Sequence, residues 1–116
     1  MQRDKLFLKR PGFEDPAFPG RTFYCLHSAL VEGVLTSFPA LAAHLTVERV
    51  AWPGSGNSVA QWTGEDNPSL PLLVLTPGES SRYRTGTYQD RVLIAGKDRI
   101  LAALSERHGF PDPHHP

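Results

Sequence analysis

The most apolar run of the chain is Leu70-Pro71-Leu72-Leu73-Val74-Leu75, and it decides the class of fold. A short apolar run without polar alternation is typical of a strand that is buried on both faces. A proline is tolerated where such a strand begins, because little of the hydrogen-bond ladder is lost there. The run therefore predicts a buried central strand that is entered through Pro71.

Outward from this run, Pro and Gly residues separate strand patterns from helix patterns. Besides 70–75, apolar and β-branched runs predict strands at 6–9, 45–52 and 91–95. Helical spacing predicts three helices: 25–38, a short one from a cap at Asn57 or Ser58 through Trp62 to Gly64, and 97–108 ending at Gly109. The segments 11–24 and 76–90 are predicted to be loops.

The spacing also predicts which helix faces are buried. In the first helix the predicted inward residues are Leu26, Ala29, Leu30, Gly33, Val34 and Phe38, and in the last helix Ile100, Leu101 and Leu104. The resulting order, βαβαββα, indicates an α/β fold. A chain of 116 residues fits one domain, which we place at 1–110, followed by a proline-rich extended tail at 111–116.

Composition and charge exclude several classes of protein. Twelve Lys and Arg residues balance twelve Asp and Glu residues, so no overall field favours nucleic acid. The N-terminal apolar run is far shorter than a signal peptide or a membrane span, and we expect a cytoplasmic protein without a membrane partner. One cysteine excludes an internal disulfide and a cysteine-based zinc site, and we predict no bound metal.

Three segments resemble an uncharacterised bacterial thioredoxin-like family that is classed as a domain of unknown function. They are Lys9-Arg10-Pro11-Gly12-Phe13-Glu14-Asp15-Pro16, Phe23-Tyr24-Cys25-Leu26-His27-Ser28 and Ser69-Leu70-Pro71. The resemblance implies the thioredoxin-like fold in its glutaredoxin version, with a four-stranded mixed sheet flanked by helices. Relatives tend to read Cys-Pro-x-Cys where this chain has Cys25-Leu26-His27-Ser28, so the second thiol is absent here.

Cys25 is the candidate nucleophile. A cysteine at a helix N-terminus faces unpaired N–H groups and the positive end of the helix dipole, which favour the thiolate. Ser28 can donate a hydrogen bond but cannot form a disulfide, so a thiol from outside the chain has to complete any catalytic cycle. The alternative is that Cys25 is a small buried apolar residue beside Phe23 and Tyr24 and is unreactive.

The remaining candidate residues are substrate contacts that the resemblance implies. It implies a cis peptide bond at Leu70-Pro71 that presents the backbone of Leu70 to an extended thiol substrate. Gly96 and Asp98, where the last helix begins, resemble a glutaredoxin turn that holds the γ-glutamyl end of glutathione. Simple helix capping by Asp98 is the alternative.

The other charged and aromatic residues have ordinary interpretations. We expect Tyr24 and His27 to flank the thiol, although His27 also suits a solvent-facing position on the helix. The cations Lys9 and Arg10 could pair with a carboxylate of glutathione, with surface charge as the alternative, and Trp52 is interpreted as packing.

Two functions follow from these residues. The first is monothiol exchange of disulfides at Cys25, with glutathione as co-substrate or a thiol-bearing protein as partner. The second is a non-enzymatic binding module that keeps the thioredoxin-like fold but has lost the second cysteine. A glutathione-assisted iron–sulfur site shared by two chains is a third, remote option, which follows only from the Cys-x-x-Ser spacing.

Overall fold

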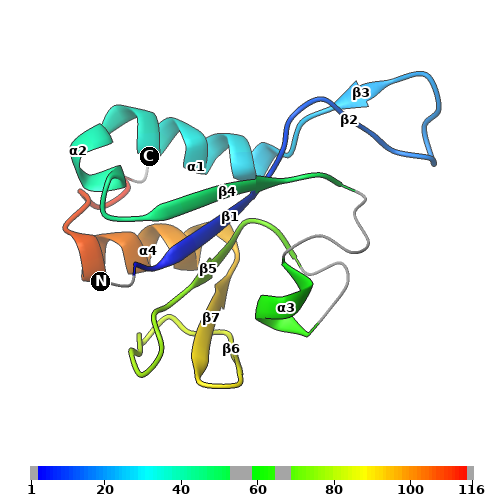
Figure 1. Cartoon of the computed structure of the whole chain (residues 1–116). Helices are drawn as coiled ribbons and strands as arrows, with labels where there is room; N and C mark the ends of the chain where they lie inside the picture. The colour runs from blue at the N-terminus through cyan, green and yellow to red at the C-terminus, as the bar shows by residue number, and fades with distance from the viewer. Residues whose placement is uncertain (1–2, 53–58, 65–68, 115–116) are drawn as a thin grey trace.

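A computed structural model describes residues 3–52, 59–64 and 69–114 of the chain (Figure 1). Two predicted cap positions, Asn57 and Ser58, lie outside the described residues. The elements in chain order are β1 (Lys5–Lys9), β2 (Phe13–Glu14), β3 (Thr22–Phe23), α1 (Leu26–Ser37), α2 (Pro39–Ala42), β4 (Thr46–Val50), α3 (Ala60–Thr63), β5 (Leu72–Val74), β6 (Gly86–Tyr88), β7 (Arg91–Ala95) and α4 (Lys97–His108).

Five strands form one mixed sheet in the order β4-β1-β5-β7-β6. Strand β1 is parallel to β4, from the pair Lys5 and Thr46 to the pair Lys9 and Val50. Antiparallel pairs then join β1 to β5, β5 to β7 and β7 to β6. The predicted central strand therefore lies in the middle of the sheet, and all three residues of β5 are buried.

The sheet has five strands where the sequence predicts four, because β6 lies inside the predicted loop 76–90. Strand β6 has only three residues, and it pairs with β7 through the two-residue turn Gln89-Asp90. Gln89 has a φ of 56°, the left-handed conformation that such tight turns use. A strand this short and polar leaves no apolar pattern for sequence analysis to detect.

The predicted loop 11–24 also contains regular structure. Strands β2 and β3 form a small hairpin that is separate from the main sheet, with Phe13 opposite Phe23. Figure 1 shows this hairpin projecting from the body beyond the ends of β1 and β4. Each of its strands has two residues, which is below the length at which a strand pattern can be recognised.

Apolar cores lie on both faces of the sheet because side chains alternate along each strand. Leu6 and Leu8 of β1 join the larger core, which α1, α2 and α4 cover. Phe7, between them, joins the smaller core, to which Trp62 of α3 contributes. The helices thus enclose the sheet from both sides, with α3 alone on one of them (Figure 1).

The predicted buried face of α1 is wrong except at Val34, which is partly buried and packs against the larger core. The buried residues of the helix are Ser28, Val31 and Leu35, whereas Leu26 is 71% exposed and Leu30 is 46% exposed. Apolar residues occur on several sides of this helix, so periodicity alone does not determine which side packs on the sheet. Helix α4 has the predicted bounds and ends at Gly109, which is left-handed. Ile100 and Leu104 are buried as predicted, together with Ala103, whereas Leu101 is only partly buried.

A buried carboxylate connects the N-terminal end of the sheet to α4. Asp4 is 2% exposed, and Arg107 donates to its two oxygens from Nε at 2.7 Å and from Nη2 at 3.1 Å. The N–H of Thr76 also donates to it at 3.1 Å, and Nε2 of His108 lies 2.8 Å from Oδ2.

None of the helices in the described parts of the chain is long and apolar enough to cross a membrane.

Candidate functional site

Cys25 occupies the position that caps the N-terminus of α1. Its backbone is extended, with φ −82° and ψ 120°, and its Sγ accepts a hydrogen bond from the N–H of Ser28 at 3.4 Å. The first N–H groups of a helix have no partner within the helix, so a thiol here receives donors from the backbone. Cys25 is partly exposed rather than buried, which differs from the alternative interpretation of it as a buried apolar residue.

Ser28 fixes the geometry around the thiol. It is 2% exposed, and its Oγ accepts a hydrogen bond from the N–H of Lys9 at 3.1 Å. This bond joins the first turn of α1 to the last residue of β1. The hydroxyl keeps its own hydrogen for donation to the sulfur of Cys25, so Ser28 bridges the strand and the nucleophile.

The surroundings lower the pKa of the Cys25 thiol below its usual value. Partial burial raises this pKa, but hydrogen bonds from the hydroxyl and N–H of Ser28 and from the N–H of His27, together with the positive charge of Lys9, outweigh the burial. A thiolate attacks disulfides and a neutral thiol does not, so this environment favours the reactive form. Sequence analysis did not identify the effect of Lys9 on Cys25, because that effect depends on tertiary structure.

Leu70 and Pro71 lie at the same end of the sheet as Cys25. The peptide bond between them is cis, as expected. The antiparallel register ends with Phe7 opposite Leu72, and its continuation brings Pro71 and Leu70 beside the end of β1. Lys9 of that end is hydrogen-bonded to Ser28, so the two predicted motifs converge at one edge of the fold. Pro71 is fully buried and Leu70 is partly buried.

The other predicted contacts are exposed. Tyr24 and His27 lie at the surface on either side of Cys25 in sequence. Gly96 precedes α4 with a φ of 91°, a conformation that suits glycine. Asp98 forms an ion pair with Lys97 at 3.0 Å, and its side chain does not cap the helix.

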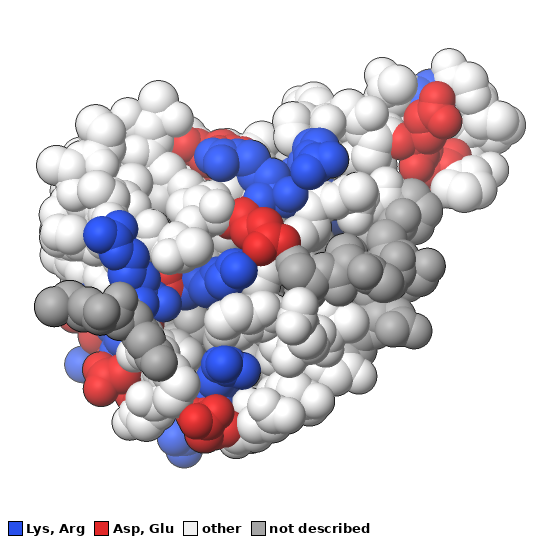
Figure 2. All heavy atoms as spheres, viewed as in Figure 1, with Lys and Arg blue, Asp and Glu red and all other residues white. Residues whose placement is uncertain are grey.

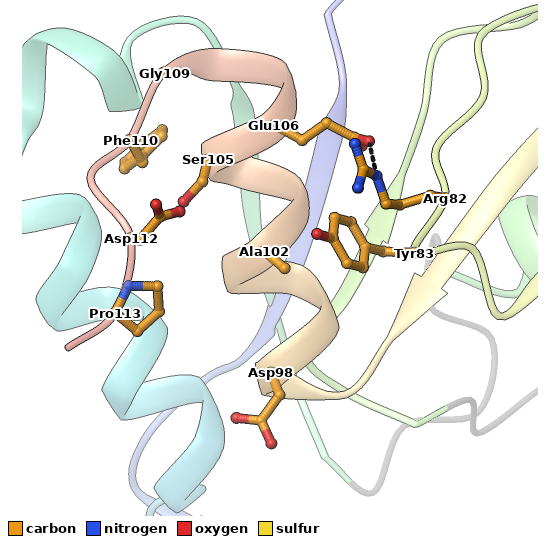
Figure 3. Close-up of a pocket in the computed structure, with 10 residues that line it drawn as sticks. All are labelled: Arg82, Tyr83, Asp98, Ala102, Ser105, Glu106, Gly109, Phe110, Asp112 and Pro113. Carbon is orange, nitrogen blue, oxygen red and sulfur yellow. Dashed lines mark hydrogen bonds and ion pairs between the residues drawn. The ribbon is translucent and has the colours of Figure 1, made fainter. Parts of the chain in front are cut away.

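A hollow of about 790 Å³ lies along α4, away from the thiol (Figure 3). Its walls are α4, the segment after it and the residues before β6, and Figure 3 shows the Tyr83 ring turned toward the helix. Arg82 is ion-paired with Glu106 across one side at 3.2 Å. Asp98 lines this hollow, but Cys25 and Ser28 do not, so the structure does not unite all the predicted contacts in one pocket.

No metal site is evident in the part of the chain that the structure describes. Among residues 3–52, 59–64 and 69–114, no three His, Cys, Asp or Glu side chains are grouped so that they could hold a metal ion.

The fold and the site define a mixed α/β protein with a partly exposed cysteine at the start of a helix. The chain belongs to the family described as protein of unknown function (DUF3088), whose model matches residues 3–112. This agrees with the uncharacterised family that the sequence resembles. Neither the curated proteins nor the solved structures contain a match to the chain.

Proposed function

We propose that this chain is a thioredoxin-like protein of the glutaredoxin type that exchanges disulfides through the single thiol of Cys25. The observation that carries the proposal is the position of the Cys25 Sγ, which accepts the Ser28 N–H at the start of α1. The thioredoxin-like part of the proposal is supported by the parallel β1-α1-β4 unit, the antiparallel β5 and β7, and α4.

The chemistry requires a thiol from outside the chain, because Ser28 cannot act as a second thiol, and in this proposal that thiol is glutathione. In the first step the Cys25 thiolate attacks the glutathione sulfur of a mixed disulfide, a sulfur–sulfur bond breaks, and the substrate leaves as a thiolate that takes up a proton. In the second step a glutathione thiolate attacks the glutathione sulfur now bound to Cys25. Oxidised glutathione is released, and the Cys25 thiolate is restored.

The remaining candidate residues have binding roles in this proposal. The backbone of Leu70 pairs with the extended tripeptide, as peptides do at the open edge of a sheet. The start of α4 at Gly96 attracts a carboxylate, and Asp98 attracts an ammonium group. Exposed Tyr24 and His27 flank the bound thiol. A cytoplasmic location, which the sequence predicts, supplies glutathione in its reduced form.

The proposal is tested by mass spectrometry of the intact protein after incubation with oxidised glutathione. We expect one glutathione adduct, located on the peptide that contains Cys25 and removed by reduced glutathione. The Cys25→Ser variant is the control and should gain no mass. If the folded wild-type protein forms no adduct, the exchange activity is contradicted, and the non-enzymatic binding module becomes the better interpretation.

A further inference from the structure

The ammonium group of Lys9 lies against two aromatic rings at the foot of the β2–β3 hairpin. Its Nζ is 5.3 Å from the ring centre of Phe13 and 4.7 Å from that of Trp52. The two rings also pack edge to face, with their centres 5.1 Å apart. Phe13 comes from β2 and Trp52 follows β4, so separate parts of the chain hold one cation in place.

A second lysine on the same strand provides a comparison. Lys5 also lies over two rings, those of Phe7 and Trp62, but its Nζ is 2.9 Å from a carboxylate oxygen of Glu48. Among the described residues, no carboxylate is within ion-pair distance of Lys9. Aromatic faces attract a cation through the ring quadrupole and leave its net charge intact, whereas a carboxylate neutralises it.

Other charged groups also lie near this edge of the sheet, and most of them have partners of their own. Arg49 of β4 forms a two-point ion pair with Glu32 of α1, at 2.7 and 2.8 Å. The guanidinium of Arg10 donates to the carbonyl of Arg49, and His27 is exposed on α1. Figure 2 shows Lys and Arg side chains gathered over the ends of β1 and β4, at the foot of the hairpin. The hairpin contributes exposed Glu14, whose carboxylate is not paired with Lys9.

We propose that Phe13 and Trp52 are positioning residues that hold the Lys9 ammonium, unpaired with any carboxylate among the described residues, at the end of β1 that is hydrogen-bonded to Ser28, from where its charge acts on Cys25. The hairpin is then part of the reactive site, because its first strand, β2, supplies the Phe13 ring. At the base of the hairpin, the Gly12 N–H donates to the Phe23 carbonyl at 2.8 Å, which connects the segment after Lys9 to the segment before Cys25. The inference deepens the proposed function, since it rests on Cys25 reacting as a thiolate.

The experiment measures the rate at which iodoacetamide alkylates Cys25 as a function of pH, which gives the pKa of the thiol without glutathione. The variants are Lys9→Met, Trp52→Leu, Trp52→Phe and the double variant Lys9→Met with Trp52→Leu. Trp62→Leu is the matched control, because it removes one of the two rings that contact Lys5, the lysine that is paired with Glu48. Thermal unfolding followed by circular dichroism confirms that each variant is folded.

We expect Trp52→Leu to raise the pKa of Cys25 by about 0.3 to 0.5 unit, an approximately two- to threefold decrease in the acid dissociation constant of the thiol. Lys9→Met should raise it at least as much, and the double variant should match Lys9→Met alone. Trp52→Phe keeps a ring face and should stay close to wild type, as should Trp62→Leu.

Additive effects in the double variant would overturn the inference, because the ring would then act independently of Lys9. An unchanged pH profile in Trp52→Leu would overturn it as well, and so would equal shifts in Trp52→Phe and Trp52→Leu. These outcomes are distinct from failure of the proposed function, since the alkylation profile is independent of whether a glutathione adduct forms. If Trp52→Leu does not fold, Phe13→Leu replaces it with the same expected shift.

Discussion

At the scale of single residues, the state of the Cys25 thiol depends on a buried hydroxyl. Ser28 accepts from the Lys9 N–H and offers its own hydrogen to the sulfur, while its N–H donates to the same sulfur. Sequence analysis paired Ser28 with Cys25 because the family that the chain resembles tends to have a second cysteine at that position. In that analysis the role of Ser28 was only that it cannot form a disulfide. Its hydrogen bond with the Lys9 N–H depends on the packing of α1 against β1, which no local pattern shows.

The role of Ser28 is tested with Ser28→Ala. The change removes the hydroxyl donor, so the pKa of Cys25 should rise, and it leaves the Lys9 N–H without its acceptor, which should cost about 1–2 kcal/mol of stability. Alkylation against pH and urea unfolding measure the two effects. Ser37→Ala is the control, because that hydroxyl bonds only to the Gly33 carbonyl at the exposed far end of α1. A wild-type alkylation midpoint in Ser28→Ala would contradict this role.

At the scale of elements, the strands and helices follow from local patterns, but the orientation of α1 does not. The strand at 91–95 and the helix at 97–108 have the predicted bounds, since each has a clear apolar period and a glycine at its end. Helix α1 has apolar residues around much of its circumference. The side that packs is set by the bond from the Lys9 N–H to Ser28 and by contacts with the sheet, neither of which is local.

The observed orientation of α1 gives a test with two leucines of the same helix. Leu35 is 6% exposed, so Leu35→Ala should lower the free energy of unfolding by about 2–4 kcal/mol. Leu30 is 46% exposed, and Leu30→Ala should cost less than about 1 kcal/mol. Urea unfolding compares the two variants, and a larger loss in Leu30→Ala would show that the orientation is wrong.

At the scale of the whole molecule, one buried ion network holds both ends of the described chain together. Asp4 precedes β1, whereas Arg107 and His108 end α4. Burial raises the pKa of the Asp4 carboxyl, but hydrogen bonds from His108, Arg107 and the Thr76 N–H, with the charge of Arg107, outweigh it and lower the pKa from 3.8 to about 2. Sequence analysis did not identify this network, because its members are about a hundred residues apart.

The lowered pKa predicts how stability changes with pH. The carboxyl is more acidic in the folded state than in the unfolded state, so its ionisation stabilises the fold above pH 4 by about 2 kcal/mol and this is lost as pH falls to about 2. Asp4→Asn removes the buried carboxylate that Arg107 contacts at 2.7 and 3.1 Å and should cost about 3 kcal/mol at pH 7. Urea unfolding should show that the difference in the free energy of unfolding between the wild type and Asp4→Asn becomes smaller between pH 4 and pH 2.

The exposed carboxylate of Asp98 provides the control for this prediction. Asp98→Asn removes a surface ion pair with Lys97 and should change stability by less than about 1 kcal/mol at either pH. A gap between Asp4→Asn and wild type that stays constant from pH 7 to pH 2 would contradict the assigned pKa.

The sequence by itself determined the α/β class, the central strand that begins after Pro71, the approximate positions of the longer strands and helices, and the position of the lone thiol at a helix start. These features depend on local period, chain breakers and caps, which act between residues a few positions apart. Only the tertiary structure decided the edge strand β6, the buried face of α1, and the contacts of Lys9 with Ser28 and Trp52. Those features depend on which surfaces pack, and packing between distant segments is absent from any local pattern.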